Sequence, residues 1–182
     1  MKAKPSKRPG AVVLELNQRD EPMLASASLR PFQIRRILVP IDFSECATKA
    51  LRYAVPMAAQ HGATLVLLYV LPTPPDGFRD AAIDFESAVA GMCAGAKNAL
   101  VNLAKTEIGD RVGSEVAVRN GSPRVEITDF ARGLPADLIV ISTHGYTGIK
   151  HFLLGSVAEH VIRHAPCPVL IVREREREFL AP

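Results

Sequence analysis

The sequence predicts an α/β fold in which five parallel strands form one open, doubly wound sheet with helices on both of its faces. Five short apolar runs, rich in Val, Ile and Leu, have the length and composition of buried parallel strands. Segments with apolar residues at helical spacing separate each run from the next, so strands and helices alternate along the chain. Because crossovers between parallel strands are right-handed, this alternation makes the open sheet the default arrangement.

The first predicted strand covers residues 35–41, with Pro40 near its end, where pairing within a sheet stops. Ser44 is a suitable N-cap for a helix that runs to about His61. Gly62 then fits the C-terminal cap of that helix.

The second predicted strand covers residues 64–71 and is followed by a proline-rich loop. Residues 81–107 carry apolar side chains at helical spacing, interrupted by Gly91 and Gly95. They therefore form one long helix, or two helices that meet at the glycines.

A short alternating strand is predicted over residues 115–119, before a turn that contains Ser122 and Pro123. The serine is placed as the N-cap of the next helix and the proline at its first position. The remaining elements keep the alternation: a strand over 138–141, a helix over 156–164 and a strand over 167–172.

The fourth strand leads into a glycine-bearing loop that ends at a helix start. Gly145 lies in this loop, and Gly155 directly precedes Ser156. A strand that leads through such a loop to a helix N-terminus is typical of sites that hold phosphate. Ser156 and Glu159 also match a capping box, in which case the serine caps its own helix.

Ligands of doubly wound sheets bind beyond the carboxyl ends of the strands, at the point where the strand order reverses. The loops after the first and fourth strands are the two most unusual in the sequence. If these strands are neighbours, residues 40–42 and 142–148 form opposite walls of one crevice. Asp42 would then accept hydrogen bonds from an adenine or a ribose, or it would begin the next helix.

Composition divides the chain into a basic N-terminal arm (1–33), a folded domain (34–173) and a charged C-terminal tail (174–182). The first 36 residues hold eight Lys or Arg and three acidic residues, a balance of +5, so the remainder carries −2 of the total +3. The arm, which contains four prolines, is predicted to be disordered. Residues 12–16 form either a short strand or a segment packed on the domain.

Several function classes and locations are disfavoured by composition. Aromatic residues make up only 5% and Trp is absent, which argues against a nucleic-acid partner that needs stacking platforms. No apolar run approaches the roughly eighteen residues of a membrane span, and no signal-peptide core is present. The three cysteines form no C-x-x-C pair, so we expect a reducing, cytoplasmic location.

Motifs of common catalytic and nucleotide sites are also absent. The sequence has no Ser–His–Asp arrangement, HExxH, P-loop or Rossmann G-x-G-x-x-G. The sequence therefore predicts neither a hydrolytic triad nor a metalloprotease centre.

Six segments of the chain form a recognisable set: Arg36-Ile-Leu-Val-Pro-Ile-Asp-Phe-Ser44, the turn Gly121-Ser-Pro123, Asp137-Leu-Ile-Val140, Thr143-His-Gly-Tyr-Thr-Gly148, Leu154-Gly-Ser-Val157 and Pro166-Cys-Pro-Val-Leu-Ile-Val172. In their order and in the gaps between them, these segments resemble the universal stress protein family. The resemblance spans about residues 35–172 and leaves residues 1–33 outside.

The resemblance implies an adenine nucleotide alpha hydrolase-like sheet with strand order 3-2-1-4-5 and a homodimer that pairs through Val169 to Val172. It also implies ATP as ligand, with Mg²⁺ or Mn²⁺ supplied mainly through the nucleotide. ATP-binding members carry a Gly-x₂-Gly-x₉-Gly-[Ser/Thr] motif for ribose and phosphates, matched here by Gly145 and by Gly155 with Ser156. By similarity, the adenine side and the pocket lining are Pro40, Ile41, Asp42, Val70, Ile141 and Val157.

Ser142 stands where this motif has its first glycine. Its side chain either hydrogen-bonds the ribose or narrows the site. Three functions remain open: an ATP-binding, nucleotide-responsive stress or signalling module; a stress-protein dimer without nucleotide that acts through protein contacts, which Ser142 favours; or slow ATP turnover. For turnover, the sequence offers no evident general base or arginine finger.

Overall fold

The computed structural model describes residues 2–5, 12–15, 33–73, 85–143 and 155–175. The chain divides into two units, Met1–Gln33 and Ile34–Pro182. In the first unit, β1 (Lys2–Pro5) pairs antiparallel with β2 (Val12–Glu15). A short strand is therefore the form that residues 12–15 adopt, and disorder of the arm in solution stays a prediction.

The second unit contains a five-stranded sheet in the order β5-β4-β3-β6-β7, and each neighbouring pair of strands is parallel. Numbered along this unit, the order is 3-2-1-4-5, as predicted. The strands are β3 (Arg36–Pro40), β4 (Thr64–Pro72), β5 (Ser114–Gly121), β6 (Leu138–Ser142) and β7 (Val169–Val172).

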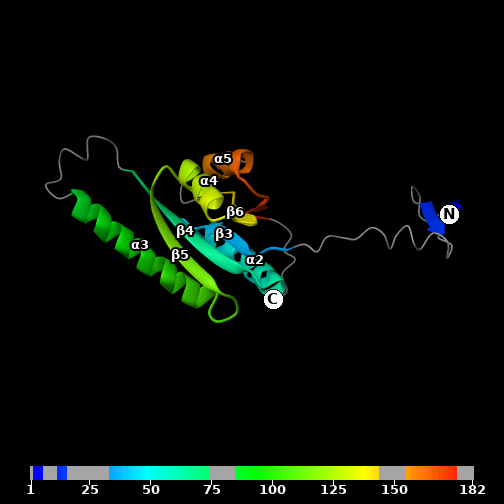
Figure 1. The fold of residues 1–182 in the computed structure, drawn as a ribbon, viewed down its shortest axis with the longest axis horizontal. Helices are drawn as coiled ribbons and strands as arrows, with labels where there is room; N and C mark the ends of the chain where they lie inside the picture. Colours follow the sequence, from blue (N-terminus) through cyan, green and yellow to red (C-terminus); the bar gives the residue numbers. More distant parts are fainter. Residues whose placement is uncertain (1, 6–11, 16–32, 74–84, 144–154, 176–182) are drawn as a thin grey trace. The chain divides into compact units, whose positions relative to one another are not determined.

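Helices cover both faces of the sheet, as the sequence predicts (Figure 1). One face packs against α2 (Glu45–His61) and α3 (Phe85–Glu107), and the other against α4 (Pro123–Gly133) and α5 (Ser156–His164). Among the described helices, none is long and apolar enough to cross a membrane.

Alternate residues of the central strands point to opposite faces, and both faces are buried. On β4, Leu65 and Leu67 belong to the core beneath α2 and α3, whereas Val66 and Leu68 belong to the core beneath α4 and α5. Each fully buried aliphatic side chain stabilises the fold by about 1.5–3 kcal/mol. This two-sided burial explains why the central strands are continuously apolar.

The ends of α2 are those that the sequence predicts. Ser44 is the N-cap, and its Oγ accepts a hydrogen bond from the Ala47 N–H at 3.2 Å. Gly62 closes the helix in the left-handed conformation, with φ 65°. The helix continues through Pro56, an exposed residue, so the backbone bond that proline removes lies on the solvent side.

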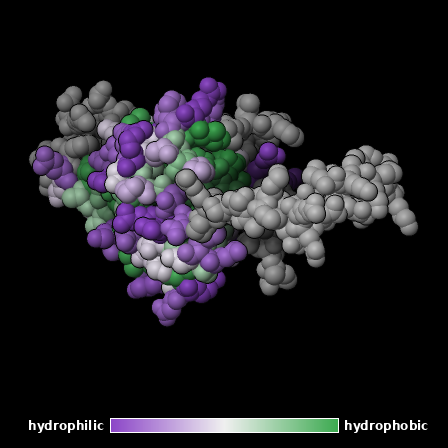
Figure 2. Space-filling model, turned by 45° about the vertical axis from the view of Figure 1, so that its right-hand side comes forward, coloured by the Kyte–Doolittle hydropathy of each residue, from purple (hydrophilic) through white to green (hydrophobic). Residues whose placement is uncertain are grey.

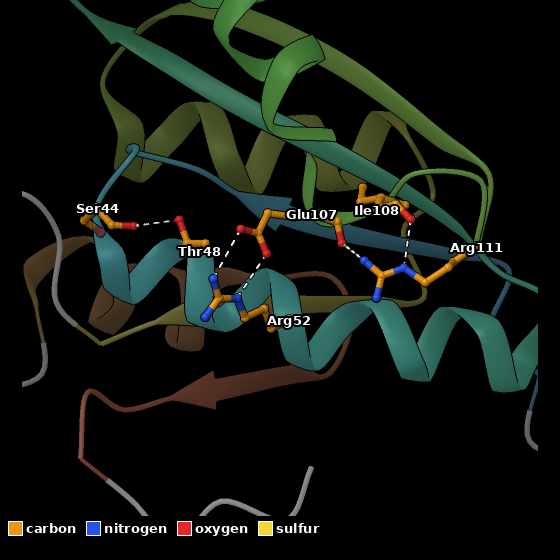
Figure 3. Close-up of polar contacts among 6 residues, drawn as sticks. All are labelled: Ser44, Thr48, Arg52, Glu107, Ile108 and Arg111. Carbon is orange, nitrogen blue, oxygen red and sulfur yellow. Dashed lines mark hydrogen bonds and ion pairs between the residues drawn. The ribbon is translucent and has the colours of Figure 1, made fainter. Parts of the chain in front are cut away.

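Polar contacts join α2 to the end of α3 (Figure 3). Arg52 Nε lies 3.0 Å from Glu107 Oε2, and the figure shows the guanidinium facing the carboxylate. Because the Arg52 side chain is 63% exposed, this pair contributes at most about 1 kcal/mol. Beyond α3, Arg111 donates from Nε to the Ile108 carbonyl at 2.9 Å and from Nη2 to the Glu107 carbonyl.

Of the two alternatives for α3, the structure shows one continuous helix through Gly91 and Gly95. Strand ends differ from the predicted bounds by one to two residues, and β5, for example, extends to Gly121. β7 begins at Val169 rather than at Cys167. The carbonyl of Pro168 nevertheless accepts the Ile139 N–H at 3.0 Å, so the approach to β7 is already held against β6.

Gly62 and Gly95 provide a matched test of backbone conformation. Gly62→Ala is expected to lower the free energy of unfolding by about 1–2 kcal/mol, because a Cβ is unfavourable in the left-handed region. Gly95→Ala is expected to raise it by about 0.5–1 kcal/mol, because a Cβ in the middle of α3 meets nothing within 4 Å. Urea unfolding followed by circular dichroism measures both, and shifts of the same sign would contradict this account.

Candidate functional site

A cleft of about 620 Å³ opens at the carboxyl ends of β3, β4 and β6. Its volume lies within the range of small-molecule sites, about 300–1,000 Å³. Its lining is mostly apolar and comprises Pro40, Ile41, Asp42, Phe43, Leu68, Tyr69, Val70, Pro72, Pro123, Ile127, Ile141, Ser142, Thr143, Gly155, Ser156, Val157 and Ala158.

The structure brings most of the predicted site residues together at this cleft. Nine of the ten lie in its lining: Pro40, Ile41, Asp42, Val70, Ile141, Ser142, Gly155, Ser156 and Val157. The tenth, Gly145, lies outside the described residues. The two segments expected to face each other across a crevice, after β3 and after β6, both contribute to the lining.

The divergence of β3 and β6 explains why a cleft forms here. Their register pairs Ile37 with Leu138 and Leu38 with Ile139, near the start of each strand. Beyond these pairs β3 leads to α2 on one face of the sheet, and β6 leads towards α5 on the other. The space between the strand ends is therefore the switch point at which doubly wound sheets bind ligands.

The turn after β3 is organised by Asp42. Its Oδ1 accepts hydrogen bonds from the Ser44 backbone N–H at 3.0 Å and from the Ser44 hydroxyl at 2.6 Å. Ser44 in turn caps α2. Two roles were left open for Asp42: contact with a nucleotide, or a part in the start of the helix. The structure shows the second, because Asp42 holds the N-cap residue Ser44. Asp42 also lies in the cleft lining.

Gly155 lies unusually close to the end of β6. Its N–H donates to the Thr143 carbonyl at 2.9 Å, and a Cβ added to it would lie 2.6 Å from that carbonyl oxygen. Only glycine fits this approach without a shift of the backbone. Gly155 therefore fixes the start of α5 against the end of the strand.

α5 begins at Ser156, as the sequence predicts. The alternative that Ser156 and Glu159 form a capping box is wrong, because Gly155 occupies the N-cap position and no side chain caps the helix. Glu159 pairs instead with Arg163, at 2.9 Å.

This start leaves backbone donors at the cleft. The first hydrogen bond of α5 runs from the Glu159 N–H to the Gly155 carbonyl at 2.9 Å. The N–H groups of Ser156, Val157 and Ala158 precede it and have no acceptor within the helix. These residues line the cleft, so the positive end of the helix dipole lies at one side of it.

Some lining residues had no signal in the sequence. Phe43 and Tyr69 form a tilted aromatic pair, with ring centroids 5.1 Å apart. The others are Leu68, Pro72, Pro123, Ile127 and Ala158. The Gly121-Ser-Pro123 turn indicated the start of α4, but no local pattern indicated that this start faces the cleft.

The described lining of the cleft contains few ionisable groups. Asp42 is the only Asp, Glu, Lys, Arg or His in its described lining. No group of three or more potential metal ligands occurs among the described residues. The thiols of Cys46 and Cys167 lie outside the lining, and burial raises the pKa of both, which makes them poorer nucleophiles.

Comparison of sequences places the chain among known proteins. The profile of the universal stress protein family matches residues 33–173. Universal stress protein MJ0531 of Methanocaldococcus jannaschii is 34% identical over 146 residues, covering 79% of this chain and 85% of that protein. Universal stress protein Sll1388 of Synechocystis is 31% identical over 149 residues, covering 76% of this chain and 97% of that protein.

Solved structures give the same result. Protein MJ0577 of Methanocaldococcus jannaschii superposes with a TM-score of 0.69 at 30% identity, and the superposition covers 80% of this chain and 100% of that protein. Universal stress protein UspA from Lactobacillus plantarum gives a TM-score of 0.64 at 29% identity, covering 78% of this chain and 99% of that protein.

Proposed function

Because the chain belongs to the universal stress protein family, we propose that it binds ATP in the cleft and acts as a nucleotide-responsive stress or signalling module. One observation carries the proposal: an apolar cleft at the switch point of the sheet has the N-terminus of α5 at one side. An adenine nucleotide has the matching asymmetry, with a flat, largely apolar base at one end and phosphates at the other.

The two sides of the cleft offer different chemistry. Pro40, Ile41 and Val70 provide apolar surface for the base. At the other side, Ser156 and the first N–H groups of α5, which have no acceptor within the helix, provide donors for phosphate. Within this proposal, the backbone donors of α5 and a metal ion carried by the nucleotide contribute to balancing the phosphate charge.

In this proposal, Ser142 contributes its hydroxyl to the ribose side of the site. It is the last residue of β6, where it is paired with Val172, and it lines the cleft. A hydroxyl at this place can hydrogen-bond a ribose. The alternative, a stress-protein dimer that binds no nucleotide, rests on the same residue, since its Cβ replaces the motif glycine.

Two solved universal stress proteins with this fold were determined in complexes with cAMP and dAMP. They are 23% and 24% identical to this chain, with TM-scores of 0.55 and 0.54. Similarity at this level shows the shared fold. The proposal of a nucleotide for this chain rests on its own cleft.

We also propose that two copies pair through β7. This strand lies at the edge of the sheet, so one side of its backbone has no partner strand within the described chain. Its side chains Val169, Leu170 and Ile171 are only partly buried. An exposed apolar edge is a natural surface for a second copy.

Bound nucleotide is the direct test of ATP binding. The purified protein is denatured, its supernatant is analysed for nucleotide, and the stripped, refolded protein is titrated with ATP and Mg²⁺. We expect a Kd below about 1 mM. At about 100 times the Kd, ATP should raise the Tm by roughly 5–10 °C. Absence of both co-purified nucleotide and measurable affinity would favour the dimer without nucleotide.

A further inference from the structure

Phe43 has an unusual backbone conformation. Its φ is 62°, in the left-handed region, and it is one of two described non-glycine residues with positive φ. A bulky side chain in this region is strained and persists only where its surroundings impose it. The Asp42 carboxylate spans this residue, because it accepts both the backbone N–H and the hydroxyl of Ser44 across the turn.

The strained turn leaves the ring partly exposed. Apolar surface interrupts the hydrophilic surface of the molecule (Figure 2), and the large apolar side chains that are exposed include Phe43, Met92, Val125 and Ile162. Phe43 is 40% exposed, and of these four it is the one that lines the cleft. A ring placed only for packing would be buried more completely, so a further reason for its position is needed.

The position of the ring indicates another reason. Phe43 lies against Tyr69, with an angle of 42° between the ring planes, and Tyr69 packs on the core beneath α2 and α3. Val70 and Ile127, which also line the cleft, belong to the core beneath α4 and α5. The apolar side of the cleft thus has an aromatic wall on one face of the sheet and an aliphatic wall on the other.

We propose that Phe43, supported by Tyr69, is the platform on which the base of the bound nucleotide stacks, and that it makes the cleft prefer purines. This inference rests on the proposed function. Stacking on an aromatic side chain is available to every base, and the larger π-surface of a purine gains more from it than that of a pyrimidine. The left-handed turn is then the means by which the ring is held at the cleft.

Phe43→Gly separates this role from a structural one, because glycine accepts positive φ without strain. The variant should weaken ATP binding about 5- to 100-fold, the range for one stacked base. UTP binding should weaken less, so the ratio of ATP to UTP affinity should fall towards one. The Tm without ligand should equal or exceed that of the wild type. Isothermal titration and thermal unfolding measure these quantities.

Two further variants sharpen the test. Phe43→Asn also tolerates the left-handed region and should show the same loss of purine preference. Met92→Ala removes another exposed apolar side chain, one outside the cleft lining, and should leave both affinities unchanged.

Each contrary outcome has a distinct meaning. If the wild type binds ATP and Phe43→Gly keeps its ATP-to-UTP ratio, the inference is overturned and the proposed function stands. Equal losses for both nucleotides with a lower Tm would assign Phe43 a purely structural role and also overturn it. A wild type that binds no nucleotide overturns the proposed function and, with it, this inference.

Discussion

Gly155→Ala is expected to lower the free energy of unfolding by about 1–3 kcal/mol and the Tm by roughly 3–10 °C. The new Cβ would lie 2.6 Å from the backbone oxygen of Thr143, which cannot move aside like a flexible side chain. Relief requires the start of α5 to move away from β6, which stretches the hydrogen bond from the Gly155 N–H to Thr143. Thermal unfolding of the purified variant measures the loss.

The same movement should also displace the backbone donors of Ser156, Val157 and Ala158 from the cleft. ATP affinity is therefore expected to fall by at least about tenfold, as for the loss of one charge-assisted hydrogen bond. Gly133→Ala is the matched control, since a Cβ at that position meets nothing within 4 Å. A Gly155→Ala protein with the Tm and affinity of the wild type would show that this close approach is not needed.

Gly155 also shows which part of the role of a sequence motif can be predicted from local sequence and which part cannot. The sequence predicted that this glycine and Ser156 lie at a helix start beside a ligand site, and the structure places both in the cleft lining. It did not predict that Gly155 is required by the backbone of Thr143, twelve residues earlier in the chain. The predicted start of α5 at Ser156 is confirmed, but the N-cap is Gly155 and no side chain caps the helix.

The sheet itself could be predicted because its signal is strong and repeated. Strands buried on both faces must be apolar at successive positions, as in Leu65 to Leu68. The start and end of α2 were equally predictable, because Ser44 and Gly62 act through local hydrogen bonding and backbone conformation. The strand order came from the resemblance to a family, since apolar runs alone do not specify which strands are neighbours.

The aromatic side of the cleft could not be predicted from local pattern. Nothing in the sequence indicates that a phenylalanine adopts positive φ, and Tyr69 lies in a run whose apolar character already accounts for a strand. The two rings come together only after β3 and β4 pair side by side. The sequence indicates Asp42 as a possible ligand of a nucleotide. Its hydrogen bonds to Ser44 across the turn are evident only in the structure.

Asp42→Ala is expected to lower the free energy of unfolding by about 1–3 kcal/mol, because Ser44 loses the acceptor of its N–H and hydroxyl. Without that acceptor, the turn loses the two hydrogen bonds that span Phe43, so the ring should move from the cleft and ATP affinity should fall at least about tenfold as well. Chemical denaturation and isothermal titration measure the two effects.

Asp42→Asn separates the turn from the charge. The amide oxygen can still accept both hydrogen bonds from Ser44, so most of the stability should return. If ATP affinity returns with it, Asp42 acts through the turn and Phe43; if affinity stays low, the carboxylate itself contacts the nucleotide. Asp129→Ala is the control, because its pair with Arg132 is exposed and should contribute less than about 1 kcal/mol. An Asp42→Ala protein as stable as this control would show that the turn does not depend on the carboxylate.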